Sequence, residues 1–470
     1  MRTYYLRSFG CQMNAHDAER ICALLEGRGL ERVGAPDGAD VLVYNTCTVR
    51  KSADDRLAGH LGTAARLKRE DPGRIVLVTG CLPQAEQHDF FRRFPFVDGA
   101  VGPQNLHHLG DLLDAAVEPA DAAVKSADSA GNKASALPAV RGYFEDGAAM
   151  SGELAARRER PFQSWVQIMS GCTNFCSYCI VPYVRGPERS RRLADLLAEV
   201  HRLVGEGVRE VTLLGQNVNA YGLDLTSRAA AGEPPSPSAD GPPFPALLRA
   251  LDAVEGLERV RFMTSHPKDL SDELVAAIAE SPRVCEHVHL PAQAGSDRIL
   301  AAMRRGYTAD WFLGRVRALR EAVPEVSITT DLIAGFPGES EEEFAQTLAL
   351  VEAAAFDAAY TFVYSPRLGT AAADLPGQLP AEVKRERVER LIAATQRLAL
   401  KSHRAWVGRR AEVLVEGASR DGSLLRGRSR QNVTVNLSGP AEAGAIVEVE
   451  VTAATSTTLR GTVATATSRR

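Results

Sequence analysis

Residues 167–192 read QIMSGCTNFCSYCIVPYVRGPERSRR and hold three of the eight cysteines of the chain. Cys172, Cys176 and Cys179 follow a C-x3-C-x2-C spacing, and no histidine occurs between residues 109 and 200. A structural zinc ion takes four protein ligands, whereas a cubane iron–sulfur cluster accepts three cysteines and keeps one iron open. The stretch therefore predicts a metal centre with one local ligand missing, and an iron–sulfur cluster is the leading hypothesis.

A second set of cysteines precedes this stretch, and each of its members follows a short β-rich run. These cysteines are Cys11, Cys47 and Cys81. The runs are Arg2–Ser8, Asp40–Asn45 and Arg74–Thr79. Buried strands that alternate with helices are typical of a parallel sheet with covered faces, and the carboxyl ends of its strands share one ligand-binding edge. The pattern predicts a second shared metal site, although one buried cysteine alone would indicate only core packing, as we expect for Cys22.

The alternation of strands and helices resumes at residue 162 and gives six βα units. We expect the strands at Ser164–Met169, Glu210–Leu214, Arg259–Thr264, Glu286–Leu290, Val326–Ile333 and Ala359–Tyr364. Six units favour a partial (βα)6 barrel over a closed barrel of eight. Such barrels carry their chemistry at the carboxyl ends of the strands, and Cys172 directly follows the first strand.

The last part of the chain changes character. Short alternating strands between residues 411 and 466 predict a small antiparallel β-barrel. Residues 401–470 hold 11 Lys and Arg against 6 Asp and Glu, although the whole chain has a net charge of −4. Arg426, Arg428 and Arg430 alternate, which places them on one face of a strand or hairpin. A basic face on a small barrel favours RNA as a partner, and a solvated edge strand is the alternative.

The predicted fold class is therefore α/β, in several domains. We expect a parallel α/β domain at 1–116, a low-complexity linker at 117–158, a βα-barrel core at 159–393 and a small β-barrel domain at 394–470. No apolar run approaches the ~20 residues that cross a bilayer, and residues 1–14 do not resemble a signal peptide. We therefore expect a cytoplasmic protein with reduced thiols, no membrane partner and, by default, a monomer.

The cysteine motif Cys172-Thr-Asn-Phe-Cys176-Ser-Tyr-Cys179 resembles the signature of radical S-adenosylmethionine (SAM) enzymes. With the upstream cysteines and a C-terminal segment similar to the TRAM RNA-binding module, the chain resembles the radical SAM methylthiotransferase family. Further matching motifs are FCSYCIVPYVRGPERSR at 175–191, TSHPKDL at 264–270, HLPAQAGS at 289–296 and DLIAGFPGES at 331–340. They look most like those of the bacterial members that act on N6-isopentenyladenosine in tRNA. Ala294 stands where the family usually has serine, which affects local packing only.

The resemblance implies two 4Fe–4S clusters and SAM as cofactors. Cys172, Cys176 and Cys179 would hold the cluster whose open iron binds SAM, and the upstream cysteines would hold the cluster that supplies sulfur. The implied reaction is methylthiolation of C2 of N6-isopentenyladenosine at position 37 of tRNA. Side chains cannot break that unactivated C–H bond, so a cofactor must. An electron donor such as flavodoxin or ferredoxin and a sulfur donor are implied partners.

Individual roles follow from matching positions. We expect contacts to SAM from Tyr178, Gly215, Gln216, Asn217, Asp331, Ile333 and Gly335. We expect contacts to RNA from Arg185, Arg189, Arg426, Arg428 and Arg430. An aromatic residue beside a cluster can equally shield it, and glycine after a strand is also ordinary turn chemistry. His266 is a candidate for the rim of the active site, and no general acid or base can be named.

Three other functions compete with this hypothesis. A methylthiotransferase for threonylcarbamoyladenosine in tRNA, or for a ribosomal-protein aspartate, would share the cysteines and differ in the shape of its substrate pocket. An RNA-binding protein with a structural zinc at Cys172–Cys179 would hold one zinc and no iron. An electron-transfer iron–sulfur protein is disfavoured by the three-cysteine ligand sets and the basic C-terminal segment.

Overall fold

A computed structural model describes residues 1–48, 51–117, 141–144, 150, 154–225 and 243–464. The chain divides into two units. The first comprises Met1–Glu159, Ser170–Thr173 and Ile180–Pro187, and the second comprises Arg160–Met169, Asn174–Cys179 and Glu188–Arg470. Most of the predicted linker at 117–158 lies outside the described residues, as do residues 226–242.

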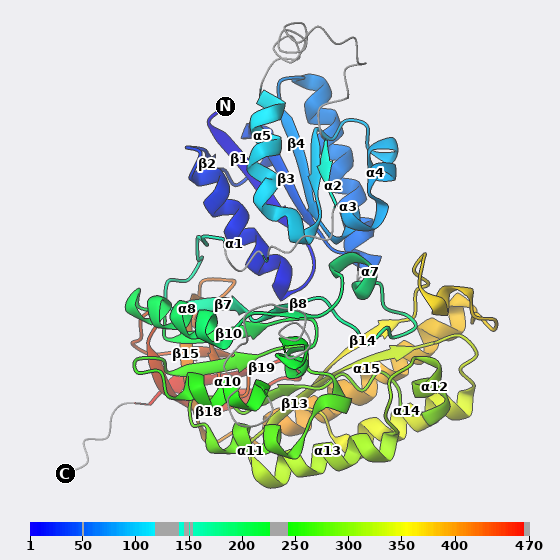
Figure 1. Cartoon of the computed structure of the whole chain (residues 1–470). Coiled ribbons are helices and arrows are strands. Elements are labelled where there is room, and N and C mark those ends of the chain that lie inside the picture. Colours follow the sequence, from blue (N-terminus) through cyan, green and yellow to red (C-terminus); the bar gives the residue numbers. More distant parts are fainter. Residues whose placement is uncertain (49–50, 118–140, 145–149, 151–153, 226–242, 465–470) are drawn as a thin grey trace, which may run out of the picture. The chain divides into compact units, whose positions relative to one another are not determined.

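The first unit is built on a parallel six-stranded sheet, in the order β2-β1-β3-β4-β5-β6 (Figure 1). Its strands are β1 (Thr3–Ser8), β2 (Glu31–Arg32), β3 (Val41–Thr46), β4 (Ile75–Gly80), β5 (Gly99–Val101) and β6 (Gly142–Tyr143). Every residue of β3 and β4 is buried, which explains their continuous apolar sequences. The predicted parallel sheet is confirmed, and β6 is an unpredicted strand from within the predicted linker segment.

Helices cover both faces of this sheet. They are α1 (Gln12–Glu26), η1 (Pro36–Gly38), α2 (Lys51–Glu70), α3 (Cys81–Glu86), α4 (His88–Arg93), η2 (Pro103–His108), α5 (Leu109–Val117) and α7 (Val181–Arg185). Leu42 and Tyr44 pack with α2 on one face, and Val41 and Val43 pack with α1 and α5 on the other. The helical segment after Cys81 is divided in two, because Gln87 adopts a φ of 47° between α3 and α4.

The second unit begins with six parallel strands that neighbour one another in chain order. They are β7 (Gln163–Gln167), β10 (Glu210–Leu214), β11 (Arg259–Phe262), β12 (His287–His289), β13 (Ser327–Ala334) and β14 (Ala358–Val363). They form two three-stranded sheets, and a parallel bridge between Val260 and Val284 joins β11 to the segment before β12. The predicted series of six βα units is confirmed.

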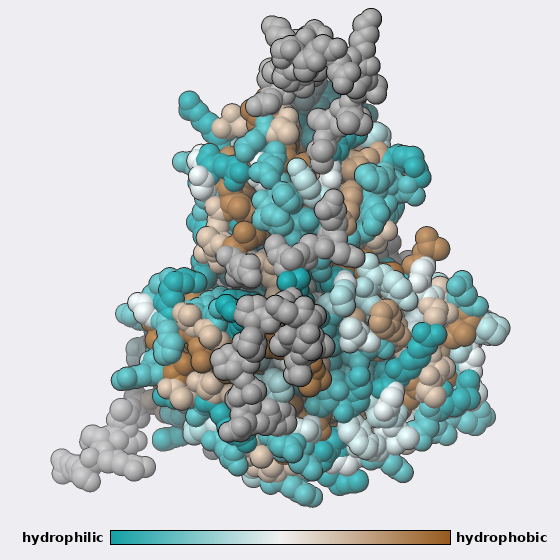
Figure 2. All heavy atoms as spheres, in the orientation of Figure 1, coloured by the Kyte–Doolittle hydropathy of each residue, from teal (hydrophilic) through white to brown (hydrophobic). Residues whose placement is uncertain are grey.

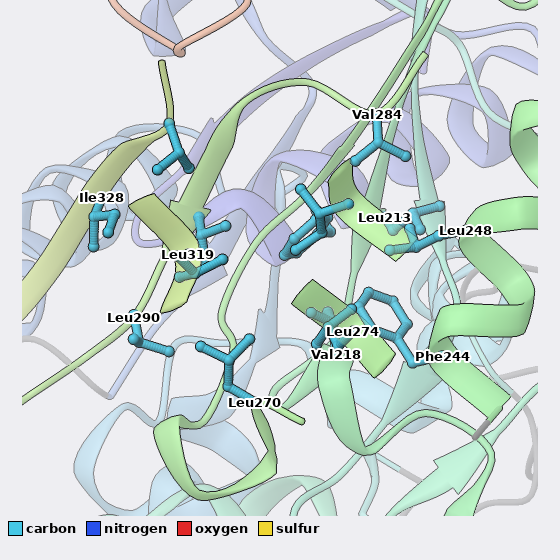
Figure 3. Close-up of a cluster of buried hydrophobic side chains, with 14 of the residues drawn as sticks. Leu213, Val218, Phe244, Leu248, Leu270, Leu274, Val284, Leu290, Leu319 and Ile328 are labelled. Carbon is cyan, nitrogen blue, oxygen red and sulfur yellow. The ribbon is translucent and has the colours of Figure 1, made fainter. Parts of the chain in front are cut away.

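The helices that follow these strands enclose the largest hydrophobic core. They are α8 (Leu193–Gly205), η4 (Val218–Ala220), α10 (Pro243–Asp252), η5 (Pro267–Asp269), α11 (Asp272–Glu280), α12 (Asp297–Ala302), α13 (Ala309–Ala322), α14 (Glu341–Ala354), η6 (Ala371–Asp374) and α15 (Ala381–Arg404). Figure 3 shows Leu213 beside Phe244 and Leu248 of α10, and Ile328 near Leu319 of α13. Ser340 begins α14 with a reciprocal capping box to Glu343, which fixes where that helix starts.

The C-terminal residues form a closed five-stranded barrel in the order β15-β16-β17-β19-β18. Its strands are β15 (Arg410–Ala418), β16 (Leu425–Ser429), β17 (Thr434–Ser438), β18 (Ile446–Ala454) and β19 (Thr458–Val463). The predicted barrel is confirmed. It is not wholly antiparallel, because β17 and β19 are neighbours in the barrel and pair in parallel. The strand β18 lies between them in the sequence only, and it pairs with β19 in antiparallel fashion.

Two buried arginines of β11 connect this barrel to the parallel strands of the same unit through hydrogen bonds. Arg261 donates hydrogen bonds to the carbonyl oxygens of Ser429 and Arg430, both at 2.8 Å, and its Nε donates to Glu210 at 2.9 Å. Arg259 donates to the carbonyl oxygen of Arg428 at 3.0 Å. The backbone around the β16–β17 turn therefore supplies acceptors for cations of the neighbouring sheet.

None of the helices in the described residues combines the length and the apolar character needed to span a bilayer. In Figure 2 the face over α11 and α13 is mostly hydrophilic, with hydrophobic side chains scattered among polar ones.

Candidate active site

The three N-terminal cysteines lie at the carboxyl ends of adjacent parallel strands. Cys11 follows β1 and precedes α1, Cys47 follows β3, and Cys81 follows β4 at the start of α3. Cys47 and Cys81 are buried, and Cys11 is half-buried. Residues 36 and 34 positions apart in the sequence thus come to one edge of the sheet, as the spacing predicts.

Two glycines allow the chain to bring these cysteines together. Gly10 has a φ of 121°, and a methyl group there would lie 2.5 Å from Cβ and 3.1 Å from Sγ of Cys47. Gly80 has a φ of 101°, and a methyl group there would overlap the carbonyl oxygen of Thr46 and lie 2.9 Å from its amide nitrogen. Both positions need glycine for the backbone conformation and for the close approach.

Buried amides hold the same edge in place. Asn14 donates from Nδ2 to Oδ1 of Asn45 at 3.0 Å and to the carbonyl oxygen of Thr46 at 2.9 Å. Asn45 donates in return to the carbonyl oxygen of Asn14 at 2.9 Å. The Cys11 thiol donates to Oδ1 of Asn14 at 3.4 Å, so the first cysteine is oriented by this network.

The guanidinium of Arg185 lies beside this group of cysteines. Arg185 belongs to α7, is buried, and interacts with Cys81, Asp17 and Cys11. Burial raises the pKa of the Cys81 thiol, and the nearby Arg185 cation opposes that shift. From the sequence we expect Arg185 to contact RNA. Its burial and its interactions with Cys81 and Cys11 instead favour a role at the cysteines.

The donor chemistry of this edge fits an iron–sulfur cluster. Three thiols from adjacent strands, next to a fixed cation, suit a centre held by thiolates whose negative charge needs compensation. No group of three His, Cys, Asp or Glu side chains in the described part of the chain is arranged to hold a metal ion. The ligand set of Cys11, Cys47 and Cys81 therefore stays a prediction.

The cysteine motif that follows β7 is held by residues of the loop after α12. Arg305 donates from Nη1 to Sγ of Cys176 at 3.3 Å, from Nη2 to the carbonyl oxygen of Pro291 at 2.9 Å, and from Nε to the hydroxyl of Tyr307 at 3.0 Å. Arg305 is itself buried. The sequence does not single it out, because the MRRGY stretch at 303–307 carries no signal that distinguishes a buried arginine from an exposed one.

The residues between the motif cysteines are also anchored. Ser177 donates from Oγ to the carbonyl oxygen of Ala302 at 2.7 Å and accepts at its own carbonyl from the N–H of Ala372 at 2.7 Å. Tyr178 lies near Cys176 and Cys179, burial raises the pKa of its hydroxyl, and it packs on the hydrophobic cluster that contains Ile333. The structure thus brings together two of the residues predicted to contact SAM, Tyr178 and Ile333.

His266 occupies a polar pocket near Arg305. Asn217 and Asn219 both accept from its backbone N–H, at 3.1 and 2.8 Å. Burial, with Arg305 and Lys268 nearby, lowers the pKa of the imidazole to about 2, so the ring is neutral. Nδ1 accepts from the N–H of Lys268 at 3.2 Å, which leaves the proton on Nε2, a buried donor with no hydrogen-bond partner among the described residues.

The remaining residues predicted to contact SAM lie directly after β10, within β13 or directly after β13. Gly215 is close to Met169, with Gln216 half-buried and Asn217 buried after it. Asp331 lies 3.5 Å from Nε2 of His289. A methyl group at Gly335 would lie 2.6 Å from Cγ of Lys384, so the close approach at this glycine is to α15. Their contacts to SAM stay predictions.

Comparisons with known proteins cover the chain in three parts. Residues 3–102 match the uncharacterized protein family UPF0004, residues 166–351 match the Radical SAM superfamily, and residues 404–464 match the TRAM domain. The tRNA-2-methylthio-N(6)-dimethylallyladenosine synthase of Caldicellulosiruptor saccharolyticus is 44% identical over 93% of this chain and 87% of its own length. A synthase of the same name, numbered 1, from Mycobacterium marinum is 44% identical over 96% of this chain and 84% of its own length.

The chain belongs to the tRNA-2-methylthio-N(6)-dimethylallyladenosine synthase family. A radical SAM domain implies a 4Fe–4S cluster and SAM. Among solved structures, the radical SAM methyltransferase TsrM from Kitasatospora setae is similar in fold, with a TM-score of 0.51 and 15% identity over 77% of this chain and 73% of its own.

The arginines that the sequence predicts at RNA occupy different settings in this synthase-family chain. Arg189 is half-buried in β9 (Arg189–Ser190), which pairs with β8 (Met169–Ser170). Arg430 pairs through two nitrogens with Glu286 at 2.7 Å. Arg428 lies 3.2 Å from Glu416, and the more exposed Arg426 lies 3.7 Å from it. Among these three arginines of the barrel, Arg426 is thus the best placed for a polyanion, and Arg430 is engaged within the unit.

Proposed function

We propose that this chain transfers a methylthio group to C2 of N6-isopentenyladenosine at position 37 of tRNA. The observation that carries the proposal is the meeting of Cys11, Cys47 and Cys81 at one edge of a parallel sheet, in a chain that also has a radical SAM motif. The relatives' name describes the same product, and the TRAM domain supports tRNA as the substrate.

Two clusters are proposed, one for each set of cysteines. Cys172, Cys176 and Cys179 would hold the first, and Cys11, Cys47 and Cys81 would hold the second. When bound, the first supplies an electron to SAM and the second supplies the sulfur atom. Two incomplete ligand sets suit centres that each keep one iron open, whereas a structural metal would take a fourth protein ligand.

The chain's own residues would bind, orient and shield these groups. Arg305 places a permanent cation and a hydrogen-bond donor against Sγ of Cys176. The neutral His266 presents an Nε2–H donor that can hold an acceptor atom of SAM or of the base without adding charge. Tyr178 covers one side of the motif and limits the access of water.

The proposed partners follow from the chemistry. An electron donor such as flavodoxin or ferredoxin would reduce the first cluster, and a sulfur donor would replenish the second. SAM would bind along Tyr178, Gly215–Asn217 and Asp331–Gly335. A cytoplasmic location fits enzymes that act on tRNA, and a monomer is the default.

Mass spectrometry of nucleosides from the tRNA of cells that lack this protein tests the proposal. We expect the 2-methylthio group to disappear and the N6-isopentenyl group to remain. The wild-type chain and a Cys22→Ala control should restore the product, because Cys22 is buried in a hydrophobic cluster of the first unit and belongs to neither proposed ligand set. Cys47→Ala and Cys176→Ala should not restore it.

Two results would redirect or refute this assignment. Unchanged tRNA would overturn the proposed function. Loss of a methylthio group from threonylcarbamoyladenosine instead would keep the reaction and change the substrate. Iron and zinc analysis of the purified chain adds a check, since one zinc and no iron would exclude radical SAM chemistry.

A further inference from the structure

The segment directly after the radical SAM cysteines is held against the N-terminal cysteine edge. It contains α7, whose last residue is Arg185. Gln104 donates from Nε2 to the carbonyl oxygen of Arg185 at 2.6 Å. The next residue, Gly186, accepts from the N–H of Cys172 at 3.1 Å. The arginine beside one set of cysteines is therefore adjacent in sequence to the residue that accepts a hydrogen bond from the backbone of Cys172.

Arg185 is only partly satisfied where it lies. Its exposed fraction is 5%, and its Nη2 has no hydrogen-bond partner among the described residues. The nearest carboxylate oxygen, Oδ2 of Asp17, is 3.8 Å away, beyond hydrogen-bond distance. A buried N–H of a charged group without an acceptor is costly, so the site is incomplete without another acceptor. The guanidinium interacts with Cys81 and Cys11, which are proposed ligands of the sulfur-supplying cluster.

We propose that Arg185 is a positioning residue for sulfur delivery, whose Nη2–H donates a hydrogen bond to an anionic sulfur species held at the Cys11, Cys47 and Cys81 site. The inference rests on the proposed function, since it needs a cluster at these cysteines. The ligand class is a hydrosulfide or thiolate. Arginine suits it because the guanidinium stays protonated at any physiological pH and offers several donors in a fixed geometry.

Two other roles account less well for the observations. A structural ion pair with Asp17 would bring the two groups within hydrogen-bond distance and would leave no donor unused. Contact with a tRNA phosphate needs an exposed side chain, unlike that of Arg185. The burial, the unused donor and the neighbouring thiols together favour a small anion at the cysteine edge.

The test uses the full chain with Cys172, Cys176 and Cys179 replaced by alanine, so that only the N-terminal cluster is loaded. Sodium hydrosulfide is titrated in while the spectrum of the reduced cluster is followed by electron paramagnetic resonance, and the reduction potential is measured on the same samples. Arg185→Gln should weaken hydrosulfide binding by about tenfold to about 150-fold, the range for one hydrogen bond to a charged group. Its potential should become more negative, because a cation beside the cluster is lost.

Matched variants make the result interpretable. Arg185→Lys keeps the charge and should retain most of the potential and part of the affinity. Arg202→Gln removes an exposed arginine of α8 and should change neither quantity. Loss of iron in Arg185→Gln but not in Arg185→Lys would also support the proposal, because charge then decides retention.

Three outcomes count against it, each differently. Unchanged hydrosulfide affinity and potential in Arg185→Gln would overturn the inference and leave the proposed function intact. Loss of iron in both Arg185 variants would overturn it too, since packing and not charge would then be what the site needs. A parent chain that binds no cluster at Cys11, Cys47 and Cys81 would refute the proposed function itself.

Discussion

Gly80→Ala is the sharpest perturbation of the cysteine edge, because Gly80 immediately precedes Cys81. Its backbone has a φ of 101° and a ψ of −158°, a region that is essentially restricted to glycine and costs other residues about 1–3 kcal/mol. The added methyl group would also overlap the carbonyl oxygen of Thr46, and such overpacking costs about 1–3 kcal/mol more. We expect a total loss of about 2–6 kcal/mol in the free energy of unfolding.

The same change should displace Cys81 from the other two cysteines. Urea denaturation of the metal-free chain measures the stability. The iron content of chains whose radical SAM cysteines are alanines measures the N-terminal site. Gly29→Ala is the matched control, because Gly29 has a φ of 80° but a methyl group there meets no atom within 4 Å. We expect it to cost only about 1–2 kcal/mol and to keep its iron.

The comparison between the two glycines decides whether the close approach matters. Equal losses of stability and equal iron contents in Gly80→Ala and Gly29→Ala would refute the reasoning, since backbone conformation alone would then explain both. If Gly80→Ala loses stability but keeps its iron, then the substitution destabilises this edge of the sheet without displacing Cys81 from the other two cysteines.

Three further predictions concern other parts of the chain. Arg305→Met should lower the iron held by the radical SAM motif, measured in chains whose N-terminal cysteines are alanines, because Cys176 loses its donor; unchanged iron would contradict this. Burial raises the pKa of Glu19 to about 7, so the wild type should lose stability as the pH rises from about 4.5 to about 7. Glu19→Gln should remove that loss and be more stable by up to about 3 kcal/mol at pH 8 in urea denaturation, with a smaller gain at pH 5; an equal gain at both values would count against it. Arg426→Gln should weaken tRNA binding and reduce its salt slope by about 1, whereas Arg430→Gln should mainly lower thermal stability; the reverse pattern would assign the RNA contact to Arg430.

The sequence predicted the elements whose signals are local. The helices at Leu193–Gly205, Ala309–Ala322 and Glu341–Ala354 belong to the predicted βα units and carry local signals, since apolar periodicity marks all three and polar N-caps begin the last two. The strands β3 and β4 at the cysteine edge are continuous apolar runs, which only a strand buried on both faces needs. Family resemblance then supplied the cofactors, which no periodicity reveals.

The features that escaped prediction depend on distant parts of the chain. The strands β2 and β6 have two residues each, too few for any alternation to be visible. The break between α3 and α4 needs a positive φ at Gln87, and glutamine is not a residue type that indicates such a conformation. Arg185 and Arg305 look like any surface arginine in the sequence. The partners of Arg185 lie 104 to 174 positions away and Cys176 lies 129 positions from Arg305, so only the folded chain shows that both arginines contact cysteines.

The attachment of the C-terminal barrel has a consequence for how this protein can be dissected. Arg259 and Arg261 are buried, and side-chain N–H groups of both donate hydrogen bonds to backbone oxygens of residues 428–430. In a chain truncated before residue 404, both arginines would lose these acceptors, and Glu210 would remain as their shared counter-ion. Removing one partner of a buried charge network costs about 3–5 kcal/mol. A truncated chain could therefore lose activity because its catalytic unit is destabilised, and that loss would be mistaken for lost RNA affinity. Point substitutions on the outer strands of the barrel avoid this confusion.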